Sequence, residues 1–307
     1  MLAMPRIVAE APVDGIGRRK FLGMAGMGVA SCALPPGERA GDVKGCGTLR
    51  IAHLCDPQFG FTSGNPAMKH RSVERGFENY RSDVARCEKA IAIVNELNPD
   101  MLLLGGDMAQ RAKDIPLEWP RLLKMVKVPW MVTPGNHDFE SRPGRGPDRV
   151  GLERFKSIFG RDHESCEVKG WRIIAGNSQF WFPSEAKDEQ AEYETWIGAE
   201  LEKARTFNGR VVLASHIPPF AHYPEEPDSY ENCPRVFRAK RLESYSTSGA
   251  RFYLAAHQHR LVARGYKSLS VLTGEALCAN FDMRPTGFRM FEIKDDFSYS
   301  WNFIEVP

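Results

Sequence analysis

Short apolar runs alternate along the chain with longer segments whose apolar residues are spaced as on one face of a helix. The alternation begins with a run at 49–55, a helix-spaced segment at 83–98 and a second apolar run at 101–104. Further strands are predicted at 130–133, 171–175 and 211–214, and further helices near 117–126, 152–159, 189–205 and 236–245. Strands joined through helices are typical of sheets whose helices lie on the outer faces.

The pattern changes near residue 250, beyond which strand-like runs follow one another. These runs lie at 251–255, 262–266, 270–273, 288–293 and 299–304. We therefore expect an α/β fold in which two mixed β-sheets pack face to face with helices on the outside. Residues 48–307 are expected to form this one domain, without internal repeats.

The first 31 residues differ from the rest in pattern. Arg18-Arg19-Lys20 precedes a weakly apolar stretch at 21–30 that is too short to span a bilayer, and this arrangement resembles a bacterial twin-arginine export signal. Val-Ala-Ser-Cys at 29–32 resembles a lipoprotein processing box, in which Cys32 would carry the lipid. We expect export to the periplasm or cell envelope, with a lipid anchor at Cys32 and a linker at 32–47. A signal peptide cut elsewhere and a frayed cytosolic tail remain the alternatives.

Composition indicates a globular protein and argues against nucleic acid as a partner. Hydrophobic residues make up 42% of the chain and charged residues 26%, as in a globular protein with a sizeable core. Residues 1–31 carry four of the 41 basic residues and two of the 39 acidic ones, so the rest of the chain holds 37 of each sign. No basic nucleic-acid-binding surface is indicated. The six cysteines beyond Cys32 form no Cys-x-x-Cys pair, and we expect most of them to be isolated buried thiols.

Five polar clusters close the apolar runs and carry the candidate chemistry. They are Asp56-Pro57-Gln58, Gly106-Asp107, Gly135-Asn136-His137-Asp138, Ser215-His216 and His257-Gln258-His259. The last residues of neighbouring strands lie at a common edge of the sheet, so ligands far apart in sequence can converge there. We expect one metal site at this edge.

The residue types in these clusters suit a metal site. Asp56 and Asp107 follow apolar runs, where an ionised carboxylate is costly unless a positive charge faces it. For either aspartate alone, a turn or helix cap is the simpler interpretation. Because residues two apart in an extended segment point the same way, His257 and His259 can enter one pocket together with His216.

The order and types of these residues resemble the calcineurin-like metallophosphoesterase family, whose pattern is Asp-x-His, Gly-Asp, Gly-Asn-His-Asp/Glu, His and Gly-His-x-His. The resemblance covers roughly residues 49–275. Asp-Pro-Gln-Phe-Gly at 56–60 further resembles a subgroup in which glutamine replaces the first histidine. Ala256 stands where the family has glycine, a change that removes no ligand.

The resemblance implies two divalent metal ions, of Mn, Fe, Zn or Mg. Asp107 would bridge them. The first ion would be held by Asp56, His259 and Gln58, and the second by Asn136, His216 and His257. A metal-bridging hydroxide would attack phosphorus. His137 would protonate the leaving oxygen while Asp138 holds its ring. Gln58 would weaken the first site or favour harder ions such as Mn or Mg.

The resemblance also implies a function and one residue that binds substrate. Arg111, four residues after Asp107, would grip phosphate oxygens, although a solvated loop arginine is an equal alternative. The expected activity is hydrolysis of a phosphate ester on a phosphorylated small molecule or phosphoprotein. Three alternatives remain: a phosphodiesterase acting on nucleotides, a metal-binding envelope lipoprotein with impaired catalysis, and an interaction protein that uses the aromatic loops at 60–82 and 219–234.

Overall fold

The computed structural model describes residues 7–9, 47–61, 80–139 and 144–306 of the 307-residue chain. The proposed twin-arginine motif, Cys32 and most of the predicted linker lie outside the described residues. Within the first 31 residues, only the short strand β1 (Ile7–Ala9) is described, and it pairs with the last strand of the chain.

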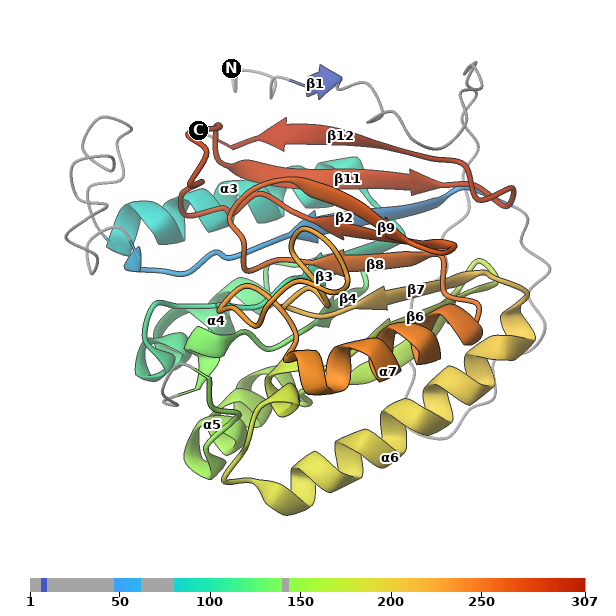
Figure 1. Cartoon of the computed structure of the whole chain (residues 1–307). Coiled ribbons are helices and arrows are strands. Elements are labelled where there is room, and N and C mark those ends of the chain that lie inside the picture. Colours follow the sequence, from blue (N-terminus) through green and yellow to red (C-terminus); the bar gives the residue numbers. More distant parts are fainter. Residues whose placement is uncertain (1–6, 10–46, 62–79, 140–143, 307) are drawn as a thin grey trace.

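Two six-stranded sheets form the body of the molecule (Figure 1). The first has the strand order β1-β12-β11-β2-β3-β4 and the second β5-β6-β7-β8-β10-β9. The strands of the first sheet are β2 (Leu49–Leu54), β3 (Met101–Leu104), β4 (Trp130–Val132), β11 (Gly287–Ile293) and β12 (Tyr299–Glu305), in addition to β1. Those of the second are β5 (Glu164–Val168), β6 (Trp171–Ala175), β7 (Val211–Ala214), β8 (Phe252–Ala255), β9 (Val262–Tyr266) and β10 (Leu269–Thr273).

Both sheets are mixed. Strands β2, β3 and β4 run parallel, whereas β11 and β12 are antiparallel to their neighbours. In the second sheet β6, β7, β8 and β10 run parallel, and β5 and β9 form antiparallel edges. The predicted fold class, two mixed sheets with helices, is confirmed.

Helices connect the parallel strands and lie on the outer faces of the sheets. The longer ones are α3 (Tyr80–Leu97), α4 (Ile115–Leu123), α5 (Arg149–Phe159), α6 (Lys187–Ala204) and α7 (Arg235–Thr247). Short 3₁₀ turns are η1 (Ala112–Asp114), η2 (Asn136–Asp138), η3 (Ser178–Trp181) and η4 (Arg205–Phe207). Helices α3 and α4 join strands of the first sheet, while α6 and α7 join strands of the second (Figure 1).

Alternation along the central strands places side chains in two kinds of core. Ile51 and Leu103 of the first sheet share a cluster with Leu254 of the second, so this cluster fills the space between the sheets. Leu54 and Leu104 point the other way and belong to the cluster that contains the buried face of α3. Strands buried on both sides read as nearly continuous apolar runs, which is why the sequence pattern located them.

One strand of the second sheet was not predicted. β5 (Glu164–Val168) lies at the sheet edge, and only Val168 among its residues is buried. Its polar sequence lacks the alternation that marks a half-buried strand, and backbone pairing with β6 holds it instead. Helix α5 follows local signals: Asp148 Oδ1 accepts a hydrogen bond from Gly151 N at 2.7 Å, and Gly160 ends the helix with φ 81°.

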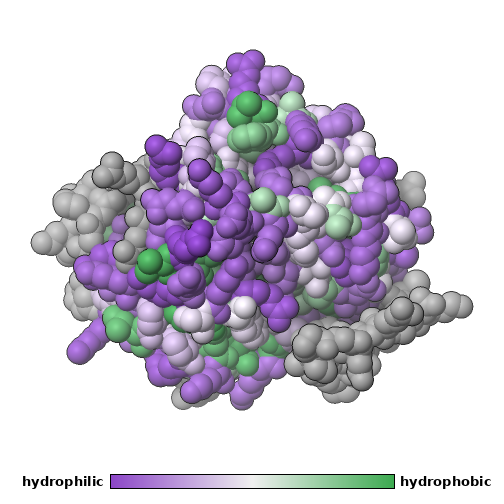
Figure 2. Space-filling model, turned by 90° about the horizontal axis from the view of Figure 1, so that it is seen from below, coloured by the Kyte–Doolittle hydropathy of each residue, from purple (hydrophilic) through white to green (hydrophobic). Residues whose placement is uncertain are grey.

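One face of the molecule is mainly hydrophilic (Figure 2). Figure 2, a view from below, shows polar residues over most of that face with separate small apolar spots. None of the helices formed by the described residues has the length and apolar character needed to cross a membrane. Five cysteines in the described part of the chain are free thiols, and four of them are buried, as expected: Cys55, Cys87, Cys233 and Cys278, with Cys166 partly exposed.

Candidate metal centre

The expected polar residues meet where strands of both sheets end. Asp56 follows β2, and Asp107 lies three residues beyond β3. Asn136 begins the 3₁₀ turn after β4. His216 follows β7, and the His257–His259 segment follows β8. Because β2, β3 and β4 run parallel, their carboxyl ends lie at one edge of the first sheet. The carboxyl ends of β7 and β8 likewise lie at one edge of the second sheet.

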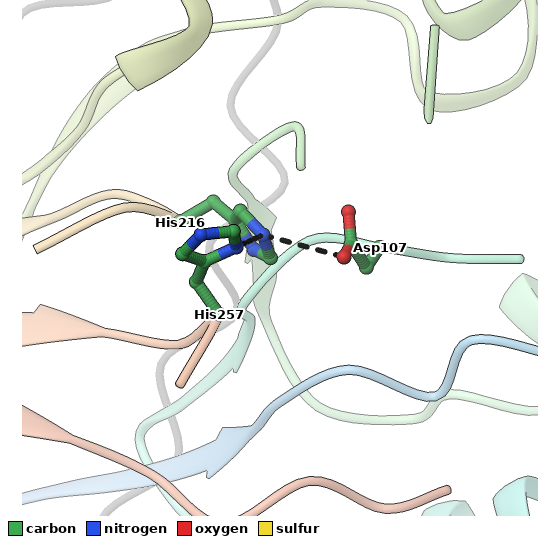
Figure 3. A group of neighbouring side chains, drawn as sticks. All are labelled: Asp107, His216 and His257. Atoms are coloured by element: carbon green, nitrogen blue, oxygen red, sulfur yellow. Dashed lines mark hydrogen bonds and ion pairs between the residues drawn. The ribbon is translucent and has the colours of Figure 1, made fainter. Parts of the chain in front are cut away.

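Asp107, His216 and His257 form the centre of the group (Figure 3). One ligand atom from each lies within 4.8 Å of those of the other two, and all three side chains are buried. His216 Nε2 is 3.4 Å from Asp107 Oδ2 and 3.1 Å from His257 Nδ1. Two ring nitrogens and a carboxylate oxygen at this spacing are typical ligands of a divalent cation.

Backbone carbonyls orient all three histidines. His216 Nδ1 lies 2.8 Å from Gly105 O, His257 Nε2 lies 2.8 Å from Tyr230 O, and His259 Nδ1 lies 2.9 Å from Ala279 O. A carbonyl only accepts hydrogen bonds, so each of these nitrogens must be the donor. In the neutral ring the other nitrogen then carries its lone pair toward the centre, as in metal-ligating histidines.

Asp56 supplies a buried oxygen that lacks a hydrogen bond. Its Oδ1 has no hydrogen-bond partner among the described residues, and it lies 3.6 Å from His259 Nε2 and 3.9 Å from His216 Nδ1. Asn136 adds an amide oxygen, with Oδ1 3.1 Å from His216 Nε2. An unpaired buried carboxylate oxygen is costly, and a cation in contact with it removes that cost. The donor set therefore fits divalent metal binding.

The pKa values show the same demand for positive charge. Burial, followed by the charge of Asp107, raises the pKa of Asp56 well above its usual range. Burial alone would lower the pKa of His216, but the carboxylate of Asp107 outweighs it and raises the value to about 9. Burial lowers the pKa of His257 to about 3 and that of His259 to about 4, so both rings are neutral near pH 7. Neutral imidazole is the form that binds metals.

The backbone at the centre adopts an uncommon conformation. Five of the expected ligands have a positive φ: Asp56 (46°), Gln58 (34°), Asp107 (53°), His257 (69°) and His259 (48°). Residues other than glycine seldom adopt this left-handed region, and such residues cluster at functional sites. The sequence pattern did not predict this feature.

Two glycines in the motifs are required by close approach. A Cβ on Gly135 would lie 2.1 Å from Asp107 Oδ1, and one on Gly106 would lie 2.6 Å from His216 Nδ1. Gly106 also has a φ of 94°. The glycines beside the predicted ligands therefore make room for ligand side chains.

The expected role of Asp138 is wrong. Its buried carboxylate does not hold the His137 ring but accepts backbone N–H groups from Asp107 (3.0 Å), Met108 (2.7 Å) and Gly135 (2.7 Å). These three amides give both oxygens of the carboxylate a hydrogen bond, so Asp138 ties the loop after β3 to the loop after β4. The His137 ring instead contacts Gln110 O through Nδ1 at 3.1 Å.

Gln58 and Arg111 lie on different sides of the group. Gln58 is buried, with Oε1 3.7 Å from Cys278 Sγ, and that sulfur also lies 3.9 Å from His259 Nδ1. Arg111 has a 65% exposed side chain, and its Nε donates to Asp114 Oδ2 at 2.7 Å. Gln58 is tied to the centre through its backbone N–H, which donates to Asp107 O at 2.8 Å. Arg111 lies in the lining of the cleft beside the centre.

A cleft of about 700 Å³ opens beside the centre. Asn136, His137 and His257 line it, together with Arg111. Tyr230 also lines it and was not singled out by the sequence, although it falls in the aromatic stretch at 219–234. One tyrosine among several aromatic residues in a long loop offers no local signal of its role.

Comparison with known proteins identifies relatives of this chain. The model of the family described as calcineurin-like phosphoesterase matches residues 49–261, more than half of the chain. The serine/threonine-protein phosphatase CPPED1 of Danio rerio is 25% identical over 262 residues, which cover 81% of this chain and 82% of that protein.

Solved structures share the fold at low sequence identity. A dimetal phosphatase from Danio rerio matches with a TM-score of 0.51 and 13% identity, covering 84% of this chain and 99% of its own. A purple acid phosphatase, PPD1, from yellow lupin matches with a TM-score of 0.53 and 15% identity, covering 84% of this chain and 53% of its own. The family match and the ligand geometry agree: this chain belongs to the calcineurin-like phosphoesterase family, hydrolases that use divalent metals and act on phosphate esters.

Proposed function

We propose that this protein is a phosphatase that hydrolyses phosphate esters at a centre of two divalent cations. The observation that carries the proposal is the buried group of carboxylate, amide and imidazole ligands around Asp107, with the unpaired Asp56 Oδ1 facing His259. A single cation would leave part of this donor set without a partner, because Asp56 and His259 lie on one side and Asn136 and His257 on the other.

The ligands divide into two sets that share Asp107. Asp56 and His259 would hold the first cation, with Gln58 nearby, since Cys278 Sγ contacts both Gln58 and His259. The second cation would be held by Asn136, His216 and His257. His216 Nε2 lies 3.1 Å from Asn136 Oδ1 and 3.1 Å from His257 Nδ1. When bound, two divalent cations lower the pKa of water and offset the negative charge of the phosphoryl oxygens.

His137 is placed to move a proton at the leaving oxygen. Its backbone N–H donates to Asp107 Oδ1 at 2.8 Å, which ties the residue to the centre. Its ring lines the cleft, and Nδ1 contacts the carbonyl of Gln110, so Nε2 is the nitrogen available to a substrate. A protonated ring donates from Nε2 to the departing oxygen while the carbonyl keeps its orientation.

Arg111 would orient the phosphate. Its Nε is held by Asp114, which leaves the two terminal nitrogens of the guanidinium for phosphoryl oxygens. Its position in the cleft lining beside His137 favours this role over that of a solvated loop arginine.

The substrate class we propose is a phosphate monoester on a small molecule or a phosphoprotein. The name of the zebrafish relative, a serine/threonine-protein phosphatase, supports protein substrates. The Asp-Pro-Gln-Phe-Gly segment at 56–60 supports membership of the glutamine-containing subgroup.

We further propose that the protein works outside the cytoplasm. Arg18-Arg19 and the following apolar stretch support the twin-arginine route, and Val-Ala-Ser-Cys at 29–32 supports a lipid anchor at Cys32. Incorporation of labelled palmitate into the wild type but not into Cys32→Ala tests the anchor, and equal labelling of both proteins contradicts it.

The test of function is hydrolysis of p-nitrophenyl phosphate and of bis(p-nitrophenyl) phosphate with Mn, Mg, Zn or Fe. Protein dialysed against a chelator is the control, and metal content is measured on the same samples. We expect faster turnover of the monoester, loss of turnover with the metal, and two metal ions per chain. Two bound ions without turnover of either ester would favour the metal-binding protein with impaired catalysis.

A further inference from the structure

Tyr230 contacts two of the proposed ligands that come from different sheets. Its hydroxyl accepts a hydrogen bond from Asn136 Nδ2 at 2.7 Å, and its backbone carbonyl lies 2.8 Å from His257 Nε2. Its ring also packs against the ring of His257, with the centroids 4.7 Å apart. One residue therefore orients both an amide ligand and an imidazole ligand of the proposed second cation site.

The contact with the hydroxyl holds the Asn136 amide in the orientation that presents its oxygen to the proposed site. An asparagine amide has an oxygen that binds cations and a nitrogen that does not, and rotation about its last torsion exchanges them. Because Nδ2 donates to the Tyr230 hydroxyl, Oδ1 is left facing His216 Nε2 at 3.1 Å. A cation at the site selects the amide oxygen, and the hydroxyl, which can donate or accept, then holds the amide by accepting from Nδ2. Without the hydroxyl, the amide loses this support.

The loop at 219–234 is built to hold Tyr230 in place. The Glu226 carboxylate accepts the backbone N–H of Ala221 at 2.6 Å and of His222 at 2.7 Å, and the side-chain amide of Asn232 at 2.6 Å. Arg238 of α7 is buried and donates to Glu226 O at 2.6 Å. A buried carboxylate and a buried guanidinium with satisfied partners rigidify such a loop.

A second anchor joins the loop to the histidine segment. Glu231, next to Tyr230, accepts a hydrogen bond from Arg260 Nη2 at 2.7 Å and from Gln258 Nε2 at 3.3 Å. The loop and the segment that carries His257 are therefore fixed to each other at Tyr230 and at the residue that follows it.

We propose that Tyr230 is a positioning residue for the second cation: its hydroxyl keeps the Asn136 oxygen, and its carbonyl keeps the His257 lone pair, directed at that site. The inference rests on the proposed function, since it assumes that these residues bind a cation. Groups that orient metal ligands typically contribute about tenfold to a hundredfold to metal affinity.

The test is Tyr230→Phe, which removes the hydroxyl and keeps the ring and the carbonyl. Titration of metal-free protein with Mn²⁺ by calorimetry should show that one of the two cations binds about tenfold to a hundredfold more weakly than in the wild type. Tyr223→Phe is the matched control, because Tyr223 lies in the same loop, is exposed, and its hydroxyl makes no hydrogen bond within the described residues. This control should titrate like the wild type.

A double-mutant cycle shows whether the hydroxyl acts through Asn136. In the Asn136→Ala background, Tyr230→Phe should cause little further loss of affinity, because the amide it orients is gone. An undiminished further loss would overturn the role through Asn136.

Three other results would also be decisive. Equal affinity for both cations in Tyr230→Phe and wild type would overturn the role of Tyr230 while leaving the proposed function intact. Equal weakening of both sites, with a lower melting temperature of the metal-free protein, would mean general destabilisation and would also overturn it. A wild type that takes up no second cation would overturn the proposed function, and this inference with it.

Discussion

The two halves of the candidate metal centre differ in what surrounds them. The half with Asp56 and His259 is enclosed: the Phe281 ring stacks on the His259 ring with centroids 4.7 Å apart, and Phe61 lies 5.1 Å from it. The half with Asn136 and His257 borders the cleft, which also exposes His137. In the proposed function each half would hold one cation, and only the half that borders the cleft could also meet the substrate. The predictions below test this division, beginning with the residue that both halves share.

Asp107→Asn should have the largest effect. Loss of the shared carboxylate charge should weaken both cations and lower kcat by about a thousandfold, because the cations supply several kcal/mol of transition-state stabilisation. Turnover of p-nitrophenyl phosphate and metal content per chain measure this effect. Full metal content with normal turnover would remove Asp107 from the centre.

His137→Ala should affect only the open half. Both cations should remain bound, while kcat for an alkyl phosphate should fall by about a hundredfold, since the leaving oxygen needs a proton. The loss should be smaller for p-nitrophenyl phosphate, because its leaving group departs without protonation. Equal losses for both substrates would contradict the role of His137 as proton donor.

Gln58→His should act on the enclosed half. An imidazole in place of the amide should raise the affinity of one cation site for Zn²⁺ by about tenfold and leave KM unchanged, because Gln58 does not line the cleft. Zinc titration and steady-state kinetics on the same preparation measure the two effects. A changed KM without a change in zinc affinity would reverse the proposed division between the halves.

Arg111→Ala should have the smallest effect. KM should rise by roughly threefold to tenfold with metal content unchanged, because the side chain is mostly exposed and its bonds to phosphate compete with water. Arg205→Ala is the control: Arg205 is also exposed and pairs with an acidic residue three positions away, Glu202, at 3.0 Å, but it lies outside the cleft lining. A similar rise of KM in both variants would exclude a specific role for Arg111.

The sequence predicted the parts of this site that depend on strand ends. Asp107, His216 and His257 each come shortly after an apolar run, and parallel pairing of these runs is enough to bring them to one edge. The fold class followed from the same runs, whereas β5 was missed because edge pairing requires no apolar pattern.

Other parts of the site depend on packing between distant loops and left no local signal. Asp138 was expected to orient His137, but three backbone amides from two loops occupy its carboxylate. Tyr230 lies in a long loop whose course Glu226 and Arg238 help to fix. Neither arrangement follows from residue spacing.

The left-handed backbone at five of the proposed ligands affects how such motifs are to be interpreted. Aspartate, asparagine and histidine are the side-chain-bearing residues most often tolerated in that conformation, and four of the five positions hold aspartate or histidine. Steric demands and coordination chemistry therefore select the same amino acids here. A descendant of this protein that lost its enzymatic role would still be under selection to retain Asp56, Asp107, His257 and His259, because they maintain the left-handed backbone of these loops. Conservation of these four residues in a relative is thus weaker evidence of catalytic activity than conservation of His137, whose φ is not positive.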